Sequence, residues 1–318
     1  MAVTGNLDHA MERFKDEIKR IYEITDLGDL CWFLGMEIKC NHAAHTISIN
    51  QKAYIEGMAT KFGLTNAKPI YIPMLPNELL THEQLPFTPA QHAEMLKIPY
   101  GNMIGYVLWP IMISRPDVLF AMGILSQFIL NPGPAHAKAL KHLITYLYTT
   151  RDCWLMFGGK DAKIITYMDA NYAQQSDRHL ILGYCLQFRA GAISWSLKKQ
   201  NIVTLSSTEA EYIGHTHAAK EVMWIRNFWT EISGKSIINP TLLKADNQGA
   251  IELSNNNKFH THTKHINVCY HFICEVIENK FLDIQYVPTD KNIVDIFTKA
   301  LTRLLFEKFR GMLGLHYA

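Results

Sequence analysis

Apolar residues recur at helical spacing through most of the first half of the chain. In residues 7–22 they stand three or four positions apart with charged residues between them, as in an amphipathic helix. Pro134 precedes a similar segment, and proline is tolerated in a first helical turn. The helices predicted in this half cover residues 7–22, 51–62, two segments within 100–128 that are joined at Ser114-Arg115-Pro116, and 135–148.

Two other patterns lie between these predicted helices. Residues 31–38 and 46–49 are apolar runs separated by a polar turn, which predicts two strands of a β-hairpin. Residues 67–86 contain Pro69, Pro73 and Pro76, which break regular structure. We interpret this stretch as a linker and as the first candidate domain boundary.

The second half of the chain has the pattern of a mixed α/β fold. Three early runs rich in β-branched and aromatic residues suggest a meander, with a turn at residues 190–191. A long helix is predicted at residues 207–232, because its apolar residues form one continuous face. The strands predicted in this half include residues 164–169, 183–189, 192–197 and 242–246.

The composition of the chain is typical of a folded globular protein. The chain has 318 residues, 48% hydrophobic and 19% charged, which indicates a folded globular protein and suggests two domains. A net charge of +2 does not mark a nucleic-acid binder, so any basic groove depends on local placement. The six cysteines include no C-x-x-C pair, which fits a reducing compartment. Without a secretory signal or an apolar run of roughly 20 residues, we expect no secretion and no membrane partner.

Acidic residues follow two of the predicted strands. Asp169 ends the run at residues 164–169, and Asp246 ends the run at 242–246. Glu211 lies near the start of the long helix between them, whereas Glu209 has capping-box spacing from Ser206 and is assigned to helix capping. Three carboxylates at one strand edge favour a site for a divalent metal ion, because hard cations prefer oxygen ligands.

Longer motifs carry a resemblance to a known family. The segments GAISWSLKKQNIVTLSSTEAEYIGHTHAAKEVMWIR, KADNQGAIEL, THTKHINVCYHFI and YVPTDKNIVDIFTKAL resemble the ribonuclease H domain of copia-type retrotransposon polyproteins. Upstream, ITDLGDLCWFLGMEI, QKAYIEGMATKFGLTNAKPI and residues 105–147 resemble the C-terminal part of the reverse transcriptase of the same elements. The motifs occur in order and cover nearly the whole chain.

The resemblance implies a specific architecture. Residues 161–305 are expected to form a ribonuclease H-like domain, a mixed five-stranded sheet flanked by helices. Residues 1–160 are expected to form a mostly helical reverse-transcriptase remnant with a β-hairpin, and residues 306–318 a C-terminal tail. The family's polymerase centre contains a Tyr-x-Asp-Asp turn, and residues 1–6 resemble the segment just after that turn. Because no Tyr-x-Asp-Asp occurs in the 318 residues, we expect no polymerase activity.

The resemblance also implies an activity. Asp169, Glu211, Asp246 and Asp295 would hold two Mg²⁺ ions, with Mn²⁺ as the alternative, and the protein would cut the RNA strand of an RNA/DNA hybrid. Other retrotransposon proteins are expected partners, and the element's life cycle implies a cytoplasmic or nuclear location. Without metal, four close carboxylates repel one another, so at least one is expected to have a raised pKa.

Each assignment has a simpler alternative. Asp246 can cap a helix that starts at Gln248, and Asp295 can interact with a helix macrodipole.

Four histidines suggest a zinc site instead: His260, His262, His265 and His271. However, no cysteine or carboxylate lies at finger spacing from them. Departures from the family pattern, such as Asn171, Tyr172 and residues 179–182, indicate relaxed constraint. The alternative function is therefore a catalytically inactive, decayed remnant that at most binds nucleic acid.

Basic residues near the predicted strand ends are candidates for substrate binding. Lys198, Lys199 and Gln200 follow the third strand of the second half, where they can meet phosphates. Lys264 or His265 is a further candidate for contact with the scissile phosphate. Trp195 and Trp224 are expected to fill the core rather than stack on bases.

Overall fold

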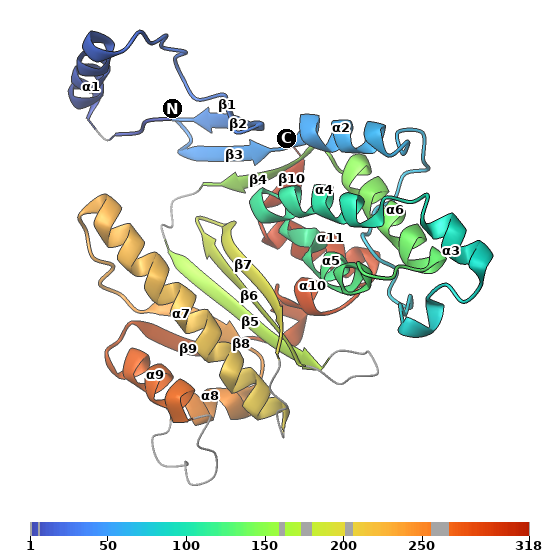
Figure 1. Cartoon of the computed structure of the whole chain (residues 1–318). Coiled ribbons are helices and arrows are strands. Elements are labelled where there is room, and N and C mark those ends of the chain that lie inside the picture. Colours follow the sequence, from blue (N-terminus) through green and yellow to red (C-terminus); the bar gives the residue numbers. More distant parts are fainter. Residues whose placement is uncertain are drawn as a thin grey trace.

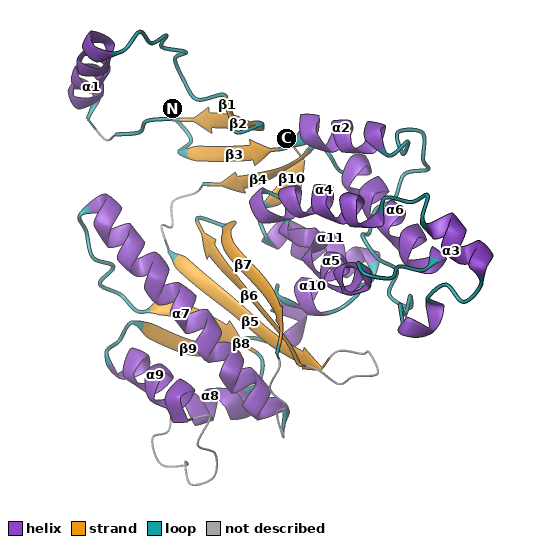
Figure 2. Cartoon of the chain, viewed as in Figure 1, coloured by secondary structure: helices purple, strands orange, loops and turns teal. Residues whose placement is uncertain are grey.

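The computed structural model describes residues 2–5, 7–158, 163–172, 180–200, 206–255 and 267–317. Two five-stranded sheets and the helices around them make up the molecule (Figures 1 and 2). The predicted combination of helices and sheets is confirmed. Among the described helices, none has both the length and the apolar character that crossing a membrane requires.

The first sheet is antiparallel and combines strands from both ends of the chain. Its order is β1-β2-β3-β4-β10. The strand predicted at residues 31–38 is wrong in one respect, because Leu34 and Gly35 adopt positive φ angles of 50° and 79° and divide it into two paired strands. The strands are β1 (Trp32–Phe33), β2 (Met36–Asn41), β3 (Thr46–Asn50), β4 (Cys153–Phe157) and β10 (Leu315–Tyr317).

The helices of the first half of the chain follow the predicted pattern closely. One helix was not predicted: α3 begins at a capping box in which Thr88 accepts a hydrogen bond from the backbone N–H of Gln91. The helices are α1 (Asp8–Ile21), α2 (Lys52–Lys61), α3 (Pro89–Met95), α4 (Tyr100–Ile113), α5 (Leu119–Leu125) and α6 (Pro134–Thr149). Short 3₁₀ turns lie at η1 (His82–Gln84), η2 (Pro116–Val118) and η3 (Ser126–Phe128).

The stretch predicted as a linker is part of the folded core. Met74 and Leu80 are only 4% and 3% exposed, and they belong to the same apolar cluster as α4 and α6. The prolines of residues 67–86 do interrupt regular structure, but the buried side chains of Met74 and Leu80 tie the stretch to the core. The interpretation of this stretch as a domain boundary was therefore wrong.

The second sheet is the predicted mixed five-stranded sheet. Its order is β7-β6-β5-β8-β9, in which β5, β6 and β7 are antiparallel neighbours and β8 and β9 run parallel to β5. The turn between β6 and β7 lies one residue earlier than predicted, at Arg189 and Ala190, which both have positive φ angles as in a type I′ turn. The strands are β5 (Ile164–Tyr172), β6 (Leu180–Phe188), β7 (Gly191–Lys199), β8 (Thr241–Ala245) and β9 (Leu282–Tyr286).

Helices cover both faces of the second sheet (Figure 1). The long α7 lies across β5 and β6 with α8 and α9 beside it, while α5 and α10 contact the opposite face. Gly214 permits close approach of α7, since a Cβ there would lie 2.6 Å from the sulfur of Met168 on β5. The helices are α7 (Ser207–Ser233), α8 (Gln248–Asn255), α9 (Asn267–Glu278), α10 (Asp295–Thr298) and α11 (Arg303–Met312), and a 3₁₀ turn, η4 (Thr289–Lys291), precedes α10.

The end of the chain returns to the first sheet. Residues 306–318 were expected to form a tail, but most of α11 and all of β10 lie in this segment, and β10 pairs with β4. Phe309 of α11 and Phe297 of α10 are fully buried in one apolar cluster with Leu140 of α6. The two halves of the sequence therefore share a hydrophobic core.

Candidate metal centre

Two neighbouring parallel strands bring Asp169 and Asp246 to the same edge of the second sheet. In the register of β5 and β8, Tyr167 lies opposite Lys244. Asp169 and Asp246 each follow two residues later, so the two strands deliver their carboxylates side by side. β5 continues to Tyr172, so Asp169 lies inside this strand and not at its predicted end, and the parallel register with β8 is what brings the two sequence-distant acids together.

The start of α7 adds a third carboxylate. Ser206 caps this helix by accepting a hydrogen bond from the N–H of Glu209, and Glu211 follows in the first turns. The Oε1 atom of Glu211 accepts a hydrogen bond from the N–H of Ala170 on β5 at 3.0 Å. Asp169, Glu211 and Asp246 thereby place one carboxylate oxygen each within 4.8 Å of one another, in what we call the three-carboxylate cluster.

Threonine hydroxyls from the η4–α10 segment hold two of these carboxylates. Thr298 donates to Oδ2 of Asp169, and Thr289 donates to Oδ2 of Asp246 at 2.8 Å. The segment is anchored on β5 by Asn292, whose amide donates to the carbonyl of Met168 at 2.9 Å.

A glycine lets this segment approach the sheet closely. A Cβ on Gly183 of β6 would lie 2.8 Å from Val294 and 3.2 Å from Thr298. The missing side chain at residue 183 therefore helps to set the position of Thr298 over Asp169.

Asp295 lies next to the three-carboxylate cluster but outside it. It begins α10, is buried, and its Oδ1 accepts a hydrogen bond from Lys299 Nζ at 2.8 Å. The structure therefore brings three of the four predicted ligands together and gives the fourth a lysine partner. Asp295 lies at the start of α10, as the alternative of an interaction with the helix macrodipole requires. This helix has only four residues.

The capping alternative for Asp246 is not what the structure shows. The cap of α8 is Asn247, whose Oδ1 accepts a hydrogen bond from the N–H of Ala250 at 3.0 Å. The Asp246 carboxylate instead accepts the hydroxyl of Thr289 and faces Asp169 and Glu211. Because its neighbour serves as the cap, Asp246 is available as a ligand.

Burial, with repulsion between the acids as a smaller cause, disfavours the charged forms of Glu211, Asp169 and Asp295, so the predicted rise in pKa has a different main cause from the one expected. Burial, with the charge of Asp169 as the second cause, raises the pKa of Glu211 to about 9. Burial also raises the pKa of Asp169, and it raises the pKa of Asp295 to about 6 against the opposing effect of Lys299. The surroundings of Glu211 therefore favour its protonated form.

The donor atoms of the centre suit a hard divalent cation. Asp169, Glu211 and Asp246 offer only oxygen, and Mg²⁺, Mn²⁺ and Ca²⁺ favour oxygen ligands. Glu211 is only 4% exposed, and its Oε2 has no hydrogen-bond partner among the residues that the structure describes. A buried carboxylate oxygen without a partner is costly, and a bound cation removes that cost.

The predicted substrate residues have different environments. Lys198 and Lys199 are exposed at the end of β7. Gln200 is buried, and its Nε2 lies 3.3 Å from Nε2 of His217, so its side chain contacts the protein interior. Lys264 and His265 lie outside the described residues, as do His260 and His262 of the suggested zinc cluster.

The expectation for the two tryptophans is half correct. Trp195 packs against the core that the two halves share, and its indole N–H donates to the carbonyl of Ile111 at 3.0 Å. Trp224 is 56% exposed, so the prediction that it fills the core was wrong. It stacks on Phe228 along the surface of α7, with ring centroids 5.2 Å apart.

Sequence reasoning missed the partners of the carboxylates. The hydroxyls of Thr289 and Thr298 and the ammonium of Lys299 did not figure among the predicted site residues. Lys299 had a readable signal, because it follows Asp295 by four residues, the spacing at which opposite charges meet on a helix. The two threonines had none, since only the tertiary structure brings them to β5 and β8.

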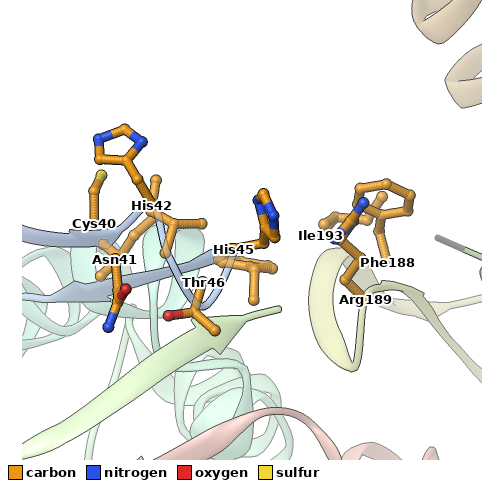
Figure 3. A pocket seen from close by; sticks show the side chains of 11 residues that line it. Cys40, Asn41, His42, His45, Thr46, Phe188, Arg189 and Ile193 are labelled. Carbon is orange, nitrogen blue, oxygen red and sulfur yellow. The ribbon is translucent and has the colours of Figure 1, made fainter. Parts of the chain in front are cut away.

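A separate cavity of about 570 Å³ lies between the β2–β3 hairpin and the β6–β7 turn (Figure 3). Its lining is mainly apolar and includes Ile47, Phe157 and Phe188, with His45 and Arg189 also at its walls. It contains none of the four predicted ligands, so it is distinct from the candidate metal centre.

Comparisons with known proteins place this geometry in a family. The family described as "Reverse transcriptase (RNA-dependent DNA polymerase)" matches residues 1–76. The Pol polyprotein from transposon TNT 1-94 of Nicotiana tabacum is 35% identical over 318 residues, covering 99% of this chain and 24% of the relative. That of transposon RE1 of Arabidopsis thaliana is 31% identical over 317 residues, covering 98% and 21%.

The chain belongs to the copia-type retrotransposon Pol polyproteins. It corresponds to their C-terminal region and spans about a quarter of the length of these relatives. The second half of this Pol region has the mixed five-stranded sheet flanked by helices that the resemblance to ribonuclease H implied.

Two solved structures are also similar to the Pol region. A ribonuclease H1 called LC11, in complex with an RNA/DNA hybrid, is 14% identical with a TM-score of 0.31, covering 41% of this chain and 88% of that one. The N-terminal ribonuclease H domain of a Mycobacterium tuberculosis protein is 12% identical with a TM-score of 0.33, covering 48% and 98%.

Proposed function

We propose that this Pol region is a Mg²⁺-dependent ribonuclease H that cuts the RNA strand of RNA/DNA hybrids internally. In this proposal Asp169, Glu211, Asp246 and Asp295 hold two Mg²⁺ ions, with Mn²⁺ as the alternative. The observation that carries the proposal is the three-carboxylate cluster, in which a deeply buried oxygen of Glu211 has no partner within the described part of the chain. Family membership supports it, because the matched relatives are retrotransposon Pol polyproteins.

The proposed reaction is hydrolysis of a phosphodiester. Water adds to phosphorus, the bond to the 3′-oxygen breaks, and the products carry a 3′-hydroxyl and a 5′-phosphate. A pair of divalent ions supplies charge stabilisation to the attacking and departing oxygens. The chain's own contribution is to hold the ligands in place. Thr298 orients Asp169, Thr289 orients Asp246, and the N–H of Ala170 fixes one oxygen of Glu211.

The sheet offers a surface beside this centre for the nucleic acid. Asp169 lies opposite Gly183, and Gly183 lies opposite Leu197, so the next residues of β7, Lys198 and Lys199, lie at the same end of the sheet as Asp169. We assign these lysines to phosphate contacts, which are independent of base sequence. Lys264 and His265 stay in the proposal as further contacts, and recognition of the RNA strand would rest on its 2′-hydroxyls.

The test is cleavage of an end-labelled RNA/DNA hybrid by the full chain in Mg²⁺. We expect internal cuts with 5′-phosphate ends, no cleavage in EDTA, and little cleavage of the RNA alone. In Asp169→Asn the rate should fall at least about 100-fold, since even outer partners of a metal site cost 10- to 100-fold.

A matched variant controls for the loss of one carboxylate. Asp283 is an exposed acid on β9, and Asp283→Asn should cleave like the unaltered protein. Absence of product from the folded, unaltered chain would refute the proposal and support the alternative of an inactive remnant that at most binds nucleic acid. Undiminished cleavage by Asp169→Asn would assign the activity to other residues.

A further inference from the structure

The four proposed ligands form two sets, because three of them converge and the fourth is paired with Lys299. Asp169, Glu211 and Asp246 already converge within 4.8 Å of one another. Asp295, by contrast, is paired with the ammonium of Lys299 at 2.8 Å. One part of the centre is thus assembled, while the remaining ligand is held by a positive charge of the protein itself.

The backbone holds Lys299 beside Asp295. Lys299 follows the last residue of α10, and its N–H donates to the carbonyl of Asp295 at 3.0 Å. The side chain of Lys299 is 32% exposed, whereas that of Asp295 is 6% exposed. The side chain of Lys299 is therefore more accessible to solvent than that of Asp295, and its flexible four-carbon stem allows the ammonium to move without a change in the short helix.

The ammonium faces more than one carboxylate. Burial of Lys299 opposes its charge, but Asp169, Asp295 and Asp246 together outweigh burial and raise the pKa of the lysine. Only Asp295 is close enough for a direct ion pair among the described contacts. Lys299 is thus paired with Asp295 next to the three-carboxylate cluster.

We propose that Lys299 is a positioning residue that occupies the second cation position of the centre until a divalent ion replaces it. This inference rests on the proposed function, because it presupposes two divalent ions. The three-carboxylate cluster accepts one ion while Lys299 stays in place. Asp295 becomes a ligand only after Lys299 has released it, so the second ion binds more weakly. A doubly charged ion can displace the ammonium because its attraction to the carboxylates is stronger.

Titration of the full chain with Mn²⁺, followed by calorimetry, tests this order of binding. We expect two Mn²⁺ per chain, the second bound about tenfold or more weakly than the first, within the range usual for coupled sites. In Lys299→Met the second affinity should rise about tenfold while the first stays unchanged, because no ammonium has to leave. A purely structural role of Lys299 would not shift the second affinity alone.

Three further variants make the result decisive. Lys299→Gln should behave like Lys299→Met, which protects the test if one variant folds poorly, and Lys299→Arg should keep a weak second site. Lys308→Met is the matched control, because the ammonium of Lys308 donates to the backbone carbonyl of Asp290 rather than to a carboxylate. It should leave both affinities unchanged.

The possible failures are distinguishable. If the unaltered chain binds two Mn²⁺ and the two uncharged variants at position 299 bind them with the same affinities, the proposed function stands and the role of Lys299 is refuted. Loss of affinity at both positions in these variants would also refute it. If the folded, unaltered chain binds no Mn²⁺, the proposed function itself fails.

Discussion

The protein contains two groups of buried charged residues, and they differ in whether opposite charges of the protein itself neutralise them. In the first half of the chain, Arg115 and Asp117 are fully buried and form a two-point ion pair at 2.9 and 2.8 Å, and Tyr146 donates to the same carboxylate. In the second half, the three-carboxylate cluster joins charges of one sign. The first group is complete without a ligand, whereas the second contains a buried oxygen of Glu211 that has no partner among the described residues.

The pKa shifts of the two groups run in opposite directions for this reason. Burial acts to raise the pKa of Asp117, but the Arg115 guanidinium outweighs it and lowers that pKa below its usual range. For Glu211, burial and the neighbouring Asp169 act together, and the pKa rises to about 9. Burial alone therefore does not indicate function, and the sign of the neighbouring charges is what separates a structural ion pair from a candidate site.

The largest expected effect is on stability, at the balanced group. Asp117→Asn should lower the free energy of unfolding by about 3–5 kcal/mol, because it leaves Arg115 buried without its counter-charge. Denaturant unfolding with and without Mg²⁺ measures this loss, which should be the same in both conditions. The exposed pair of Lys52 and Asp152 provides the control, since solvent screens it and Asp152→Asn should change stability little. A smaller loss of unfolding free energy for Asp117→Asn in Mg²⁺ than without Mg²⁺ would contradict the comparison.

Glu211→Gln, measured in EDTA, is expected to change protein stability by an intermediate amount. The folded-state pKa of Glu211, about 9, lies above its ordinary 4.5, so the folded protein binds more protons than the unfolded chain between these pH values. Stability should therefore fall as pH rises from about 4.5 to 9. Glutamine cannot ionise, so the variant should lose much of this slope and be more stable than the unaltered protein at pH 8, by on the order of 1–3 kcal/mol.

Thermal unfolding in EDTA across this pH range tests the expectation. Glu231→Gln, at an exposed position of the same helix, should keep the original slope. A variant at Glu211 that is less stable than the unaltered protein at pH 8 would show that this carboxylate is compensated within the protein, as in the Arg115–Asp117 pair.

The smallest expected effect concerns a hydroxyl beside the cluster. Thr289→Val removes the hydrogen bond to Asp246, a loss of about 0.5–1.5 kcal/mol, so Mn²⁺ affinity should fall about two- to tenfold. Thr289→Ser retains the hydroxyl and should bind Mn²⁺ normally. Equal losses in both variants would point to packing of the threonine methyl group as the cause.

Local patterns were sufficient for most helices and strands. The face of α7, the meander of β5 to β7, and the location of Asp169 in β5 and of Asp246 just after β8 all follow from the order of residues along the chain. Two of the features that escaped this reasoning did so for a clear physical reason. The break at Leu34 depends on positive φ angles, and the exposure of Trp224 depends on which side of α7 the sheet covers.

The order of residues suggested which acids can meet, because Asp169 and Asp246 each end a predicted strand and Glu211 lies between them near the start of a predicted helix. The tertiary structure was needed to pair β5 with β8 in parallel and so to bring Asp169 and Asp246 together. Tertiary contacts were needed to establish how the four acids are divided: Asn247 caps α8 in place of Asp246, and Asp295 forms an ion pair with Lys299 outside the cluster. They also place β10 at the edge of the first sheet, where a tail was expected. Hydrogen bonds, ion pairs and strand pairing between distant segments depend on the packing of the whole chain, which spacing along the sequence does not specify.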